Sequence, residues 1–238
     1  REGVKRFPEN IALRFNLARV LWVYGSYEEA YDVFCQLIDN HKLLKFNASV
    51  DGLLSHRIRP LSDMFNYGDY YRLAAETLQN PTSNYLVLNI IISSAYTYLA
   101  SAELIRNQPE QAPGNLEKAL IYDPHNFIAH RLSVETLSNI GGHEEPLLNS
   151  FFAAVNLYPP LLLSHGKKGI EAALILGKEK MAADIIKKFI LFYSRTSLAD
   201  GSRLGGSETY ISIIHNHRDL LSGWVRDLAD ELITEGET

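Results

Sequence analysis

The chain has 238 residues, of which 46% are hydrophobic and 21% are charged, the composition of an ordinary soluble globular protein with a sizeable core. Its formal net charge is −5 and it has no run of Lys or Arg, which argues against a nucleic-acid-binding or basic membrane-surface protein. Its single cysteine, Cys35, leaves no partner for an intramolecular disulfide, and we expect a reducing, cytoplasmic setting. Because the chain begins at Arg1 rather than Met, we expect a region of a longer protein.

Two short amphipathic helices joined at Gly25 open the chain. Asn10 is a capping residue for the first helix, which the pattern predicts from about Ile11 to Tyr24. Gly25 ends that helix because glycine adopts a left-handed turn conformation at little cost. Apolar residues at three- and four-residue spacing then predict a second helix from Tyr27 to about Asn40.

An irregular stretch follows, and after it a long run without charge. This stretch begins at His41, and Pro60 predicts a short or broken helix, or a loop, around Arg57 to Leu61. The uncharged run from Asn84 to Ala102 is long enough for a membrane span. Its Asn, Ser and Thr side chains make insertion costly, so we favour a helix buried between neighbours on two sides, with the span as the alternative.

Three further helix pairs are predicted between Ser93 and about Thr196, with turns at Gly141-Gly142 and Gly177. Phe189 to Tyr193 has the composition of a strand, but its continuity with the preceding apolar pattern favours a helix end. The C-terminal part is expected to be a loop followed by an amphipathic helix, or a pair of helices, that caps the stack.

The first hairpin resembles the tetratricopeptide repeat (TPR), a pair of antiparallel helices with a period of about 34 residues. The matching residues are Leu17, Ala18, Leu21, Gly25, Tyr27, Ala30 and Phe34. Together with the downstream units, the resemblance covers 11–44 and 93–196. It implies an all-α fold, a right-handed superhelical stack of antiparallel helix pairs (a TPR-like α-solenoid) of about ten to twelve helices. The expected parts are an N-terminal hairpin (1–44), an irregular or degenerate helical unit (45–92), three repeats (93–196), and a loop with capping helices (197–238).

In this family the first helix of each pair lines a concave groove. The resemblance therefore implies a peptide- or partner-binding surface that includes Phe15, Arg19, Trp22, Arg131, Glu135, Lys167 and Glu171. The carboxylate-clamp members of the family hold a Lys and an Asn at the places of Phe15 and Arg19, which argues against a clamp here. A groove with aromatic and arginine anchors suits a peptide or a partner helix.

No catalytic, cofactor-binding or metal site is predicted. His215 and His217 alternate by two, which is a poor chelating geometry on a helix, and Cys35 lacks an evident activating group. The loop from Gly201 to Glu208 faintly resembles the first loop of two-Rossmann-domain glycosyltransferases, where backbone amides face a nucleotide-sugar. We expect a non-catalytic protein–protein interaction scaffold; the alternative is an accessory TPR region of a larger enzyme such as a glycosyltransferase. Self-association through the uncharged helix from Asn84 to Ala102, or through an open stack end, is a further expectation.

Overall fold

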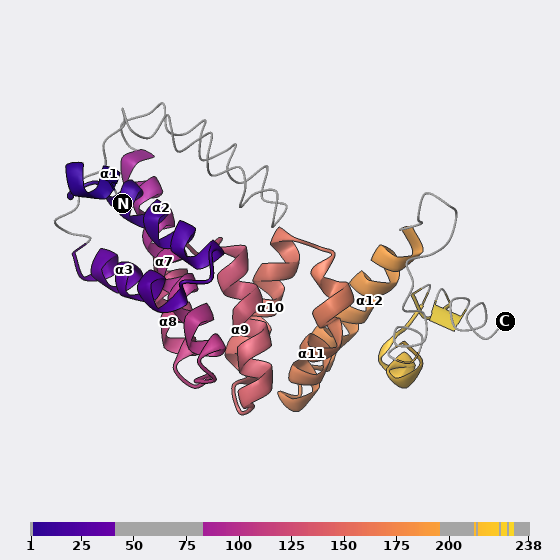
Figure 1. The fold of residues 1–238 in the computed structure, drawn as a ribbon. Coiled ribbons are helices and arrows are strands. Elements are labelled where there is room, and N and C mark those ends of the chain that lie inside the picture. Colours follow the sequence, from indigo (N-terminus) through magenta and orange to yellow (C-terminus); the bar gives the residue numbers. More distant parts are fainter. Residues whose placement is uncertain are drawn as a thin grey trace. The chain divides into compact units, whose positions relative to one another are not determined.

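A computed structural model of the chain describes residues 2–40, 83–195, 212, 214–223, 225–227 and 229–230. These residues form helices joined by turns (Figure 1), so the predicted all-α class is confirmed for this part of the chain. The helices are α1 (Glu2–Arg6), α2 (Ile11–Val23), α3 (Tyr27–Asp39), α7 (Ser83–Ile105), α8 (Ala112–Tyr122), α9 (Phe127–Ile140), α10 (Glu144–Leu157), α11 (Leu161–Ile175), α12 (Glu179–Arg195) and the short 3-10 helix η1 (Arg218–Leu220). The predicted irregular stretch from His41 lies outside the described residues as far as residue 82.

Consecutive helices pack against each other: α2 on α3, α7 on α8, α10 on α11 and α11 on α12. The chain divides into two compact units, Arg1–Ala129 and His130–Thr238. In the first unit α3 also packs on α7, which brings the N-terminal hairpin against a helix far along the chain.

Local signals in the sequence set the limits of the first hairpin. Asn10 caps α2, since its side-chain Oδ1 accepts the N–H of Leu13 at 2.9 Å. After α2 the chain passes through Gly25 at φ +79°, a conformation that side-chain-bearing residues adopt only under strain. The predicted helices on either side of Gly25 are confirmed as α2 and α3.

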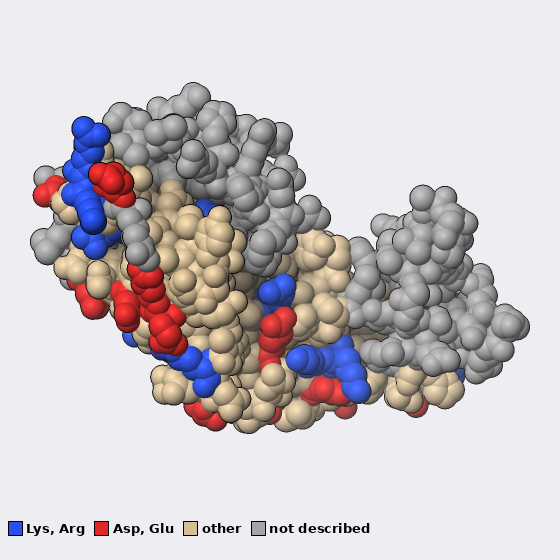
Figure 2. All heavy atoms as spheres, viewed as in Figure 1, with Lys and Arg blue, Asp and Glu red and all other residues tan. Residues whose placement is uncertain are grey.

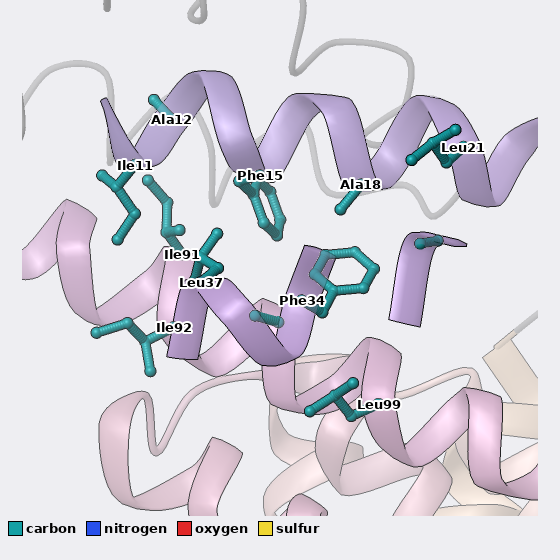
Figure 3. Packing of buried hydrophobic residues seen from close by; sticks show 12 residues of the cluster. Ile11, Ala12, Phe15, Ala18, Leu21, Phe34, Leu37, Ile91, Ile92 and Leu99 are labelled. Carbon is teal, nitrogen blue, oxygen red and sulfur yellow. The ribbon is translucent and has the colours of Figure 1, made fainter. Parts of the chain in front are cut away.

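The core of the first unit lies where α2, α3 and α7 meet (Figure 3). Its largest fully buried side chains are Ile11, Phe34, Leu37 and Ile92. Removing each such side chain from water contributes about 1.5–3 kcal/mol. These contacts therefore hold α7 to the hairpin.

The uncharged run forms α7, which packs on α3 and on α8, so the predicted helix with neighbours on two sides is confirmed. Its buried polar groups are satisfied within the protein. Thr97 Oγ1 donates to the Ser93 carbonyl at 2.9 Å, and Asn126 Nδ2 donates to Ser93 Oγ at 2.8 Å. Among the described residues, Leu88–Ile105 is the one segment that length and composition would allow to cross a membrane, and half of it is buried in the protein, as in many core helices.

The second unit contains α10, α11 and α12. Gly169 lets α11 approach α10 closely: a Cβ at this position would lie 2.7 Å from the Phe151 ring. The predicted turns are confirmed at Gly141, Gly142 and Gly177, whose φ angles are +75°, +70° and +66°. Phe189 is helical and buried within α12, which confirms the helical interpretation of that segment over the strand.

The described C-terminal residues are helical at 214–216, 225–227 and 229–230, with η1 between them. Arg218 of η1 forms an ion pair with Asp230, donating from Nη2 to Oδ2 at 2.7 Å. η1 also contacts α12. Among the described residues of this part, the chain is thus helical on both sides of a break at Leu221 to Gly223.

Candidate functional site

The three site residues predicted on α2 lie beside an aromatic cluster in the first unit. Phe15 is only 8% exposed and meets the rings of Phe34 and Tyr98 edge-on. Trp22 is half-buried, with its ring centroid 5.2 Å from that of Tyr98. Phe15 therefore belongs to the hydrophobic core, and its part in binding stays a prediction.

Arg19, the third of these residues, is 9% exposed. Its guanidinium lies 5.8 Å from the centroid of the Phe15 ring, and its Nη1 lies 3.5 Å from Asn16 Oδ1. Its buried Nε has no hydrogen-bond partner. Burial raises the pKa of the nearby Tyr98 hydroxyl, and the charge of Arg19 acts in the opposite direction. Arg19 is thus a buried cation held mainly by aromatic neighbours.

The four site residues predicted in the second unit form two pairs, each one helical turn apart. On α9, Arg131 Nε lies 3.7 Å from Glu135 Oε1. On α11, Lys167 Nζ lies 3.8 Å from Glu171 Oε1, and both side chains are more than half exposed. Figure 2 shows basic side chains beside acidic ones on the face in view. The Lys167–Glu171 pair is exposed and contributes little to stability, so its side chains are accessible to a partner. Arg131 and Glu135 are less accessible, with side chains 34% and 37% exposed.

A residue that the sequence analysis missed joins α9 to α11. The imidazole Nε2 of the buried His165 lies 3.3 Å from Glu135 Oε1 and donates a hydrogen bond to it. This bond lowers the pKa of the Glu135 carboxyl, and the positive charge of Arg131 adds to the effect. The structure therefore brings Arg131 and Glu135 together with a side chain from the facing helix. Lys167 and Glu171 lie on α11 without an ion pair to Glu135.

Ser164 completes a line of three polar groups. Its Oγ lies 2.6 Å from His165 Nδ1, so both ring nitrogens of His165 are hydrogen-bonded. The order of serine, histidine and carboxylate resembles a nucleophilic triad, which would also need N–H groups for a developing oxyanion. At the start of α11 the N–H groups of Leu161 and Leu162 already donate to carbonyls. The arrangement favours a fixed imidazole ring over a nucleophilic serine.

The other candidates from the sequence are Cys35, the close histidine pair and the loop from Gly201 to Glu208. Cys35 is half-buried on α3, and burial raises the pKa of its thiol, which disfavours the reactive thiolate. In the part of the chain that the structure describes, no three His, Cys, Asp or Glu side chains gather as a metal site. The loop from Gly201 to Glu208 lies outside the described residues, so its resemblance to a nucleotide-sugar loop stays a prediction.

Comparison with known proteins gives no further information on these sites. No model of a known protein family matches the chain, and no curated protein sequence matches it. The functional argument therefore rests on the residues and their geometry.

Proposed function

We propose that the chain is a non-catalytic protein–protein interaction scaffold that binds a peptide or a partner protein through a concave helical groove. Within this proposal the hairpins stack as in a right-handed, TPR-like solenoid. α2 contributes binding residues in the first unit, and α9 and α11 contribute them in the second. The packing of consecutive helices supports the proposal, because stacked hairpins leave one helix of each pair with a continuous solvent-facing side.

The observation that carries the proposal is the α9–α11 contact through Glu135 and His165. This contact joins α9 to α11, the helix that also carries the exposed Lys167 and Glu171. Side chains held in place before binding lose less conformational entropy when a partner arrives. A surface of this kind is suited to recognition of a polar segment.

A pull-down with the purified chain tests the proposal. The double variant Arg131→Glu and Lys167→Glu is expected to lose partners that the wild-type chain retains, because it reverses two charges on the proposed surface. The matched control is Lys180→Glu, since Lys180 is an exposed lysine on α12. Identical partners for the wild type, the double variant and the control would refute the proposed surface.

A further inference from the structure

Three basic side chains surround the Glu135 carboxylate. His165 Nε2 lies 3.3 Å from it and the Arg131 Nε lies 3.7 Å away. Lys168 follows His165 by three residues on α11, which puts both side chains on one face of that helix. Arg131 comes from α9, whereas His165 and Lys168 come from α11. We call Arg131, Glu135, His165 and Lys168 the Glu135 cluster.

The single carboxylate does not use all the donors that surround it. The buried Nε of Arg131 makes no hydrogen bond, because 3.7 Å is too long for one. Among the described residues, no acidic side chain forms an ion pair with Lys168, whereas its neighbour Lys167 pairs with Glu171. Two cations with unused N–H groups therefore stand against one carboxylate that is already bonded to His165.

The cluster is held in a fixed arrangement. Ser164 bonds one ring nitrogen of His165 and Glu135 bonds the other, so the imidazole cannot turn without losing a hydrogen bond. Glu135 in turn is drawn toward His165 and lies beyond hydrogen-bond distance of Arg131. Although its Nε is buried, the Arg131 side chain is 34% exposed, and Lys168 is half-buried, so both cations can be reached from solvent.

We infer that the Glu135 cluster binds a carboxylate side chain from an acidic segment of a partner protein, with Arg131 and Lys168 as the donors. The inference rests on the proposed function, because it names the chemistry of the partner. Arginine binds carboxylates through paired N–H groups, and lysine adds a compact positive charge. Nucleic acid suits the cluster less well, since an extended phosphate backbone is bound by a run of cations, whereas Arg131 and Lys168 stand beside a carboxylate.

Fluorescence anisotropy with a labelled peptide of about twelve residues, rich in Glu and Asp, tests the inference. We expect the acidic peptide to bind the wild-type chain, a Gln/Asn peptide of equal length to bind at least about tenfold more weakly, and added salt to weaken binding. Lys168→Glu should weaken binding of the acidic peptide about tenfold or more, and Arg131→Gln should also weaken this binding. Lys180→Glu, which makes the same charge change on α12, should alter affinity less than about twofold.

An equal loss of acidic-peptide affinity in Lys168→Glu and Lys180→Glu would overturn the inference, because the affinity would then depend on the overall charge of the chain. Absence of acidic-peptide binding, or tighter binding of a single-stranded oligonucleotide, would overturn it as well. Circular dichroism of each variant shows whether a loss of peptide affinity reflects unfolding. If Lys168→Glu does not fold, the affinity of Arg131→Gln tests the inference in its place. If the pull-down partners depend on Arg131 and Lys167 while the acidic peptide fails to bind, the scaffold proposal stands and only the acidic partner is refuted.

Discussion

The rings of Phe34 on α3 and Tyr98 on α7 are stacked, with centroids 4.8 Å apart and planes 9° from parallel. Phe15 from α2 meets both rings edge-on, at 5.9 Å from Phe34 and 6.3 Å from Tyr98. Aromatic pairs in these geometries contribute about 0.5–1.5 kcal/mol beyond the burial of their surface. The N-terminal hairpin is therefore joined to α7 by ring packing.

Phe34→Ala should strongly destabilise the first unit, because Phe34 is completely buried and its removal leaves a cavity between α3 and α7. The expected loss in the free energy of unfolding is about 3–5 kcal/mol, measured by urea denaturation. Val23→Ala, at a side chain that is 67% exposed, is the control and should change stability by no more than about 0.5 kcal/mol. Similar values for the two variants would contradict this packing.

Asn126→Ala should cost about 2 kcal/mol, because Asn126 both caps α9 and joins it to α7. Its Oδ1 accepts the Ala129 N–H at 3.0 Å, and its Nδ2 donates to Ser93 Oγ at 2.8 Å and Thr97 Oγ1 at 3.1 Å. Asn10→Ala removes a cap alone and should cost about 1 kcal/mol. If urea denaturation gives equal losses for both variants, the hydrogen bonds to α7 make no net contribution.

Helix limits and turns could be predicted from the sequence because the signals that set them are local. Asn10 caps the helix directly after it, and Gly25 and Gly177 end helices through their own backbone conformations. The segment around Phe189 also followed from its neighbours, since its apolar positions continue the pattern of α12. Each of these signals lies within a few residues of the feature that it predicts.

The site could be predicted only in part because it depends on which helix faces meet. The Arg131–Glu135 pair is visible as a spacing of four, but the bond from His165 joins residues on different helices. The sequence shows a histidine on α11 and a charged pair on α9, but it does not show that these two helix faces meet. By contrast, the helical spacing of Ile11, Phe15 and Ala18 puts these residues on one face of α2, and all three are buried, so the core position of Phe15 follows from the sequence.

Gly169→Ala should destabilise the second unit although alanine is the better helix former. The added Cβ would lie 2.7 Å from the ring of the fully buried Phe151, so one of the helices must shift. Overpacking costs about 1–3 kcal/mol and exceeds the gain in helix propensity, which leaves a net loss of about 1 kcal/mol. Gly114→Ala on α8 is the matched control, because nothing lies within 4 Å of its added Cβ, and it should be neutral or stabilising. Thermal denaturation that shows both variants stabilised would refute the close approach.

Glu103→Gln should stabilise the protein at neutral pH. Glu103 is buried, its Oε1 accepts from Asn115 Nδ2 at 2.7 Å, and its Oε2 has no partner. Burial raises the pKa of this carboxyl, and the Asn115 hydrogen bond opposes the shift. Because the folded state holds the proton more tightly, the wild type loses stability as pH rises from the ordinary value of 4.5 through the folded-state pKa. The variant lacks this loss, so its advantage in urea denaturation should grow with pH; an advantage that is constant from acid to neutral pH would contradict the assignment.

Glu135→Gln should have the opposite effect. The hydrogen bond from His165, with the nearby Arg131 charge, lowers the pKa of the Glu135 carboxyl below its ordinary value of 4.5. The ionised carboxylate therefore stabilises the folded state above that value, and the contribution is lost as pH falls through the folded-state pKa. Urea denaturation should show the wild type more stable than Glu135→Gln at neutral pH, with the difference closing as the pH drops below 4.5. Glu171→Gln removes one negative charge from the same unit, where Glu171 pairs with Lys167 instead of His165, and separates this effect from that of net charge. A difference between the wild type and Glu135→Gln that persists in acid would mean that the ionised carboxylate does not stabilise the α9–α11 contact.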